Sequence, residues 1–218
     1  MFFDLIVVGG GAAGFFSAIT CAENSEKSVL ILEKTTQLLQ KVKISGGGRC
    51  NVTHDCFEPR ELSRNYPRGE KSLIGPFHRF GAADTVDWFS SRGVTLKTEA
   101  DGRMFPDTDS SQTIIDALLG AADAAGVAIH TSEGVTSIVK NEDNFELETD
   151  TGDSYTAASV LIATGGTRLT AGAKLAASLG HKLQPPTPSL FTFKIKDPRL
   201  DEMLGLSVSP AEVSIQQS

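Results

Sequence analysis

The sequence predicts an α/β fold built around a mostly parallel β-sheet, and three observations predict it. A short apolar run, Leu5–Val8, leads into a glycine-rich turn. Apolar residues at helical spacing follow this turn up to about Glu23. A second apolar run, Ser28–Glu33, comes next. Apolar runs of this kind are typical of strands buried on both faces of a parallel sheet, so the order predicts a right-handed βαβ unit.

Length and composition narrow the class of protein. The chain has 218 residues, of which 40% are hydrophobic and 22% are charged, values ordinary for a globular protein of one domain or slightly more. Its net charge of −7 argues against a nucleic-acid partner, and no apolar stretch is long enough to span a membrane. The apolar N-terminus contains Asp4 and no leading basic residue, so it does not resemble a signal peptide and we expect a cytoplasmic protein.

Further along the chain, residues 36–80 show few periodic stretches, and a loop-rich segment of this length is often functional. Beyond it the pattern alternates between helices and strands. We expect helices over Asp84–Gly93, from Ser110 or Ser111 to about Ala125, and near Lys174–Leu179. We expect strands at Val94–Leu96, Val127–Thr131, Val135–Val139, Phe145–Thr149, near Tyr155, and at Val160–Ala163. Three of these strands, from Val135 to Tyr155, form a predicted β-meander.

The first glycine-rich turn matches the pattern G-x-G-x-x-G at Gly9, Gly11 and Gly14. Such glycines permit a tight turn, close approach of the backbone to a pyrophosphate, and close packing of helix on strand. The helix N-terminus then presents free N–H groups and a positive dipole end to phosphate. Glu33 follows Gly14 by 19 residues, close to the usual spacing for the acid that binds a ribose hydroxyl. Its carboxylate disfavours a 2′-phosphate, but the motif does not separate FAD from NAD.

Two features favour FAD. The predicted meander is followed by "SVLIATGG" at Ser159–Gly166, which resembles the flavin-binding folds of the glutathione-reductase type. A second glycine-rich stretch, "KISGGGRCNVT" at Lys43–Thr53, precedes "DGRMFP" at Asp101–Pro106. Together with "LGH" and a downstream "PSL", these motifs resemble the BaiN/RdsA-type family of NAD(P)/FAD-dependent oxidoreductases, also called aminoacetone-oxidase-like flavoproteins. The resemblance extends over essentially the whole chain.

The resemblance implies that Gly46–Gly48 lie along the flavin ring or the ribityl chain, where their amides can bond the ring. Arg49 either places positive charge near the flavin or forms an ion pair that supports the loop. Asn51 either caps a turn, which is slightly favoured, or donates to the flavin, and Cys50 is expected to pack beneath the loop. The residues expected to contact the cofactor are Gly9, Gly11, Ala12, Ala13, Gly14, Glu33, Lys34, Lys41, Ser45, Gly46, Gly47, Gly48, Arg49, Cys50, Asn51, Val135, Thr164, Gly165 and Gly166. No catalytic residue and no metal ligand is predicted.

The resemblance also implies the domain organisation. Residues 1–190 would form a Rossmann-like FAD-binding domain without its C-terminal return segment, and residues 191–218 would begin an inserted β-rich domain. The chain departs from the family pattern at Leu39–Gln40 and after Gly166. Members of the family are considerably longer, so we expect a fragment whose unpaired strand edges favour self-association.

The implied function is that of an FAD-dependent oxidoreductase, or a truncated form of one. It would transfer electrons between bound FAD and a small molecule or NAD(P)H. Two alternatives remain open from the residues alone. One is an NAD-dependent dehydrogenase, and the other is a non-catalytic dinucleotide-binding fragment.

Overall fold

The structure is a computed structural model of the chain and describes residues 1–166, 171–184 and 197–198. The chain divides into a compact unit, Met1–Gln184, and a second unit, Pro185–Ser218. Only the first unit is described below. The predicted domain boundary after residue 190 and the predicted strands at Phe191–Ile195 and Val213–Ile215 lie outside the described residues, so they stay predictions.

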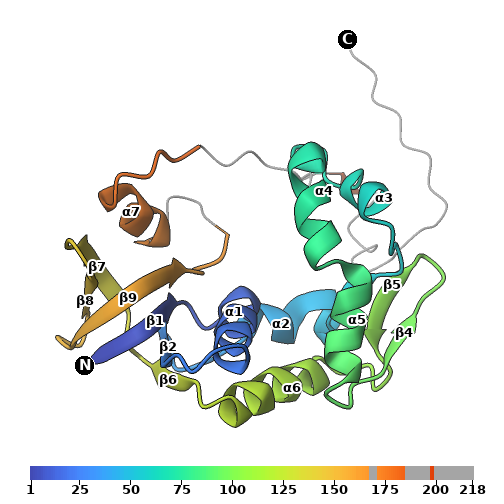
Figure 1. The fold of residues 1–218 in the computed structure, drawn as a ribbon. Coiled ribbons are helices and arrows are strands. Elements are labelled where there is room, and N and C mark those ends of the chain that lie inside the picture. Colours follow the sequence, from blue (N-terminus) through green and yellow to red (C-terminus); the bar gives the residue numbers. More distant parts are fainter. Residues whose placement is uncertain (167–170, 185–196, 199–218) are drawn as a thin grey trace. The chain divides into compact units, whose positions relative to one another are not determined.

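The larger sheet of the unit has six strands in the order β6-β2-β1-β9-β8-β7 (Figure 1). Neighbours pair in parallel from β6 to β9 and antiparallel from β9 to β7. The sheet therefore combines the predicted parallel βαβ arrangement with the predicted meander. Its strands are β1 (Phe2–Val8), β2 (Val29–Glu33), β6 (Ala128–Thr131), β7 (Val135–Lys140), β8 (Phe145–Thr149) and β9 (Ser154–Ile162).

Both faces of the parallel strands are covered. On β2, Val29 and Ile31 belong to an apolar cluster with α1 (Ala12–Glu23) and α6 (Ser111–Ala124). Leu30 and Leu32 belong to a second cluster with the meander and α7 (Ala171–Ser178). Because alternate side chains of a strand point to opposite faces, burial on both faces requires an uninterrupted apolar run, which is the pattern that predicted these strands.

A second, three-stranded sheet has the order β3-β5-β4. It consists of β3 (Thr53–His54), β4 (Leu96–Thr98) and β5 (Arg103–Pro106), with both pairings antiparallel. The β4–β5 hairpin turns at the predicted Asp101–Gly102, where Gly102 has a φ of 81°. This small sheet places the segment that follows the second glycine-rich stretch beside the "DGRMFP" motif.

The helices predicted after residue 80 are confirmed with small shifts at their ends. Helix α5 (Ala82–Ser90) begins near Asp84, whose carboxylate accepts a 2.7 Å hydrogen bond from the Gly81 N–H. Helix α6 is capped by Ser110, as predicted. Within the described part of the chain, no helix combines the length and apolar character needed to cross a bilayer.

Two predictions of secondary structure were wrong. Residues 36–80 hold more regular structure than predicted, because their helices are too short for a clear periodic pattern. The stretches near Tyr155 and at Val160–Ala163 form one strand, β9, which pairs with β1 along its length and with β8 only in its first half. The short helices are α2 (Gln40–Ile44), the 3₁₀ helix η1 (Ser45–Gly48), α3 (Pro59–Ser63) and α4 (Glu70–Arg79).

Candidate cofactor site

The first glycine loop lies at the carboxyl end of β1, directly before α1. A Cβ added to Gly14 would come within 2.0 Å of the Gly9 carbonyl oxygen, and one added to Gly9 would come within 2.6 Å of the Ala163 carbonyl oxygen. The Gly9 N–H donates to the Leu32 carbonyl at 2.8 Å. The loop is therefore closed tightly against helix and strands, as the spacing predicted.

The amino end of α1 is open. Gly11 is its N-cap and makes no side-chain cap hydrogen bond, and the first turn contains no acidic residue. Ala12 and Ala13 are exposed, and a Cβ on Gly11 would have nothing within 4 Å. First-turn N–H groups without a cap, together with the positive end of the helix dipole, suit an anion such as a diphosphate.

Glu33 lies at the carboxyl end of β2 with its carboxylate fixed. Oε2 accepts a hydrogen bond from the Gly10 N–H at 2.8 Å, and Oε1 accepts from the N–H and the hydroxyl of Thr35 at 2.9 and 2.8 Å. Its side chain is partly exposed, and carboxylate oxygens can accept several bonds, so they remain available to ribose hydroxyls.

The residues after β6 cross the same end of β2. The Glu133 N–H donates to the Glu33 carbonyl at 3.0 Å, and a Cβ on Gly134 would lie 3.1 Å from the Lys34 Cβ. The next residue, Val135, is buried at the start of β7. The structure therefore brings Glu133 and Gly134, which directly precede β7, beside Glu33 and Lys34 at the end of β2.

The stretch Thr164–Gly166 follows β9 and lies beside the first glycine loop. A Cβ on Gly9 would be 3.2 Å from the Thr164 Cα, and one on Gly165 would be 3.1 Å from the Lys41 ammonium nitrogen. Lys41 comes from α2 and also lines a cavity together with Ala12 and Ala13. Two backbone loops and one cation therefore meet at the amino end of α1.

The second glycine loop has a different conformation. Gly46, Gly47 and Gly48 have φ values of 56°, 68° and 87°, in the left-handed region, and all three are exposed. Cys50 closes the loop, and its N–H donates to the Ser45 carbonyl at 3.0 Å. The Cys50 side chain is buried, and this burial raises the pKa of its thiol.

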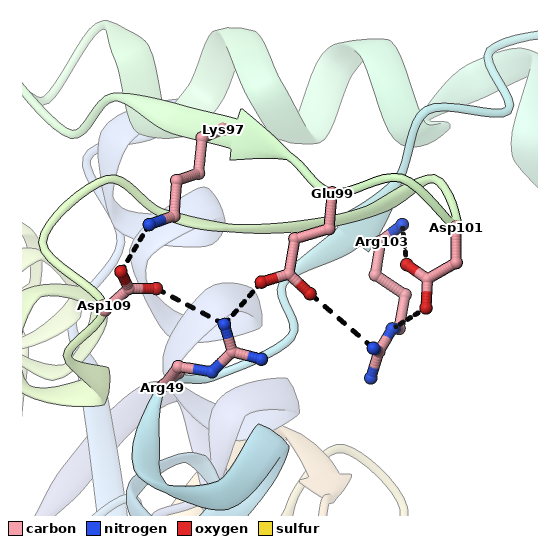
Figure 2. Close-up of polar contacts among 6 residues, drawn as sticks. All are labelled: Arg49, Lys97, Glu99, Asp101, Arg103 and Asp109. Atoms are coloured by element: carbon pink, nitrogen blue, oxygen red, sulfur yellow. Dashed lines mark hydrogen bonds and ion pairs between the residues drawn. The ribbon is translucent and has the colours of Figure 1, made fainter. Parts of the chain in front are cut away.

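Arg49 is held by an ion-pair network (Figure 2). Its Nη1 donates to Glu99 Oε1 at 2.5 Å and to Asp109 Oδ1 at 3.4 Å. The guanidinium carbon lies 4.0 Å from the centroid of the Phe105 ring. Lys97 also pairs with Asp109. Of the two roles considered for Arg49, the structure contains the ion pair that supports the loop.

Asn51 follows the loop and lies on the wall of two cavities. The structure records no hydrogen bond from its side chain to any described residue, so the turn-capping bond favoured from the sequence is not present within that part of the chain. One cavity, the inner cavity, has a volume of about 510 Å³ and lies between the loop, α1, α5 and α6. The sequence missed most of its lining residues, which are Phe16, Val42, Val52, Phe80, Thr85, Trp88, Phe89, Ile114 and Leu118.

These lining residues were missed because apolar residues at helical spacing predict burial, and burial in a core and burial around a cavity look alike in sequence. Trp88 and Phe16 are large apolar residues of the kind that usually fill a core. Their rings do contact each other, with centroids 5.4 Å apart, but both are only partly buried. No signal in the sequence indicates that α1 and α5 leave space between them.

His130 has two polar partners. Its Nδ1 lies 3.0 Å from the Tyr155 hydroxyl, which donates to Glu133 at 2.7 Å. Glu133 is three residues from His130, but Tyr155 comes from β9, so sequence spacing does not reveal it. Among residues 1–166, 171–184 and 197–198, no group of three or more His, Cys, Asp or Glu side chains could hold a metal ion.

Comparison with known proteins gives a match to a family model. The family described as "HI0933-like protein Rossmann domain" matches residues 3–195. The chain is 30% identical over 211 residues to a ribosomal RNA dihydrouridine synthase of Escherichia coli K12, covering 94% of this chain and 51% of that protein. It is 28% identical over 197 residues to a 3-dehydro-bile acid delta(4,6)-reductase of Clostridium scindens, covering 87% and 47% respectively.

A solved structure, that of THI4 from Thermovibrio ammonificans, matches with a TM-score of 0.57 and 16% identity, covering 83% of this chain and 64% of that chain. This likeness shows a shared fold. The chain spans about half the length of the curated relatives that it matches.

Proposed function

The chain belongs to the HI0933-like Rossmann-domain family, in line with the resemblance predicted from its motifs, and on this premise we propose that it is an FAD-dependent oxidoreductase. One observation carries the proposal. The uncapped start of α1, the Glu33 carboxylate and the Thr164–Gly166 loop with Lys41 meet at the carboxyl ends of three adjacent parallel strands. Dinucleotides bind at this edge in open α/β sheets.

Each part of FAD has a candidate partner. The N–H groups of Ala12–Gly14 and the Lys41 ammonium would hold the diphosphate, and Glu33 would accept hydrogen bonds from the ribose. Lys34 and Val135 would flank the adenine. The exposed amides of Gly46–Gly48 would face the flavin ring, where backbone donors tune its electronics. Bound FAD supplies the two-electron carrier that the side chains of a protein lack.

The names of two relatives suggest a class of reaction. Dihydrouridine differs from uridine by two hydrogens added across a ring C=C bond that is conjugated to a carbonyl. A delta(4,6) compound with a 3-oxo group likewise has C=C bonds conjugated to a ring carbonyl. We propose the same class for this chain. The substrate gains a hydride, supplied by NAD(P)H, at the carbon farther from the carbonyl and a proton, supplied by water, at the nearer one, while NAD(P)H is oxidised to NAD(P)⁺.

The net charge of −7 supports a small molecule rather than a polyanion as the substrate. Self-association is also proposed, because among the described residues Ser159–Ile162 of β9 pairs on one edge only, with β1, and its apolar side chains are partly exposed.

The visible spectrum of the freshly purified protein tests the cofactor. Flavin bands, or saturable quenching of Trp88 on addition of FAD, are expected. Trp88 is the single tryptophan of the chain and lines the inner cavity, so its fluorescence reports directly on this site. Quenching by NADH but not by FAD would instead support the NAD-dependent dehydrogenase. A third outcome would support the non-catalytic fragment. In that case NAD(P)H and dithionite reduce the bound FAD, but the reduced FAD passes no electrons to any cyclic enone.

A further inference from the structure

A second cavity, the outer cavity, lies next to the inner one and has a volume of about 430 Å³. The two cavities share four lining residues, Asn51, Val52, Phe80 and Thr85. The inner cavity reaches the start of α1 at Ala12–Ala13, where the cofactor site begins. The outer cavity therefore adjoins the inner cavity along these four residues, on the side away from Ala12–Ala13.

The outer cavity is lined by aromatic rings from a segment to which the proposed function gives no role. Tyr66 and Phe77 lie with their ring centroids 5.5 Å apart, and Tyr66 is 44% exposed. Phe80 contributes a third ring and is 39% exposed. Its ring centroid lies 4.9 Å from that of Phe16. Partly exposed rings that line a cavity of this size suit a flat ligand, since stacked or edge-on rings gain from each other beyond burial.

Two of the residues that line both cavities, Thr85 and Asn51, carry polar side chains that limit which ligand fits. The Thr85 hydroxyl donates to the Gly81 carbonyl at 2.8 Å, so its own donor is used. The Asn51 amide makes no hydrogen bond to a described residue, and it offers both a donor and an acceptor to the cavities. A ligand that presents a carbonyl toward these residues would accept from the Asn51 amide.

We propose that the outer cavity is the substrate site and takes a flat ring bearing a conjugated carbonyl. The ring lies against Tyr66 and Phe77, and the Asn51 amide donates to the carbonyl. Phe80, which lines both cavities, borders this ring on the side that faces the inner cavity. The inference rests on the proposed function for the claim that the bound ring accepts electrons. Binding of the ring itself requires only the cavity.

Calorimetric titration of the 218-residue chain with two probes tests the site. Both probes carry a conjugated ring carbonyl, but one is a nucleoside and the other is a steroid. Uridine presents a pyrimidinedione, and a 3-oxo-4-ene steroid presents a fused-ring enone. Saturable binding of one of them is expected, with about tenfold weaker binding in Tyr66→Ala because a stacked ring is lost. The matched control is Phe57→Ala, which removes a ring that is 52% exposed and lines neither cavity, and it should bind like the wild type.

Asn51→Ala should lower the affinity for the probe about tenfold, because the hydrogen bond to the probe's carbonyl is lost. A probe without the carbonyl should bind equally to Asn51→Ala and to the wild type. Equal losses in Tyr66→Ala and Phe57→Ala, or no binding of either probe to a chain that binds FAD, would overturn the inference. Probe binding that depends on Tyr66 in a chain that never binds FAD would support the site and overturn the proposed function instead.

Discussion

Gly14 in the first glycine-rich loop and Gly47 in the second need glycine for different reasons. A Cβ on Gly14 would lie 2.0 Å from the Gly9 carbonyl oxygen, whereas Gly47 has open space around it and a φ of 68° that favours glycine. Gly9 and Gly46 combine both reasons, because each has a positive φ and a Cβ on either would lie within 2.8 Å of backbone. Close packing therefore dominates at Gly14, and backbone conformation dominates at Gly47.

The supports of the two loops also differ. The first loop is held by its own βαβ unit and by the end of β9. The second is held through Arg49 by Glu99 and Asp109, which lie 50 and 60 residues away along the chain. We infer that Gly9 and Gly14 of the first loop tolerate no added side chain, whereas the second loop depends on a remote set of charges. The predictions below test this difference.

The largest effect is expected for Gly14→Ala. Its Cβ would lie 2.0 Å from the Gly9 carbonyl oxygen, and both groups belong to backbone that cannot move without separating α1 from β1. Overpacking of this kind lowers the free energy of unfolding by about 3 kcal/mol. Urea unfolding followed by circular dichroism measures the loss.

Gly11→Ala is the matched control for Gly14→Ala within the same loop. Because a Cβ at Gly11 meets nothing within 4 Å, stability should change by about 0.5 kcal/mol or less. The methyl group would instead occupy the space beside the free N–H groups of α1 and weaken the binding of FAD. Equal stabilities of the two variants would show that the first loop is not fixed by packing.

The second largest effect is expected for Arg49→Ala. The change leaves Glu99 and Asp109 without their shared cation and removes the guanidinium from the Phe105 ring. We expect about tenfold weaker FAD binding, equivalent to the loss of a charge-assisted hydrogen bond that positions the loop. Arg49→Lys should recover part of this loss, because a lysine keeps the charge but not the planar fork. Quenching of Trp88 during FAD titration provides the measurement.

Arg64→Ala serves as the control for Arg49→Ala. Arg64 also pairs with a carboxylate, that of Glu61, but the pair is local and its side chain is 64% exposed. FAD binding should be unchanged. If Arg49→Ala also binds FAD like the wild type, the network of Figure 2 does not position the loop.

A smaller effect is expected for Gly47→Ala. With no neighbouring atom in the way, only the left-handed backbone opposes the new side chain, at a cost of about 1 kcal/mol. Gly47→Asn should cost less, because asparagine tolerates this region better than alanine. Thermal unfolding of the two variants compares them. A Gly47→Ala variant that is destabilised as strongly as Gly14→Ala would contradict the distinction between the loops.

The same distinction explains what the sequence could predict. The first loop, Glu33 and the meander were found because strand, turn and helix signals lie within short, continuous segments. Arg49 was left between two roles because its partners, Glu99 and Asp109, are remote, and an ion pair between remote residues has no sequence spacing. The short helices α2, α3 and α4 were missed for a related reason. They contain five to ten residues and few buried positions, so packing rather than periodicity holds them.

The smallest effect is expected from acid acting on the second loop. Hydrogen bonding to Lys97, with a further contribution from Arg49, lowers the pKa of Asp109 below its usual range. The contribution of this carboxylate to stability is thus fully present above about pH 4, where the unfolded chain also ionises it, and is lost as the pH falls through the lower folded pKa. Asp109→Asn removes the ionisation. The difference in urea midpoint between the wild type and this variant should stay constant from pH 7 to about pH 4 and shrink below it. A difference that is constant into stronger acid would mean that Asp109 supports the loop through its shape, with a φ of 53°, rather than through its charge.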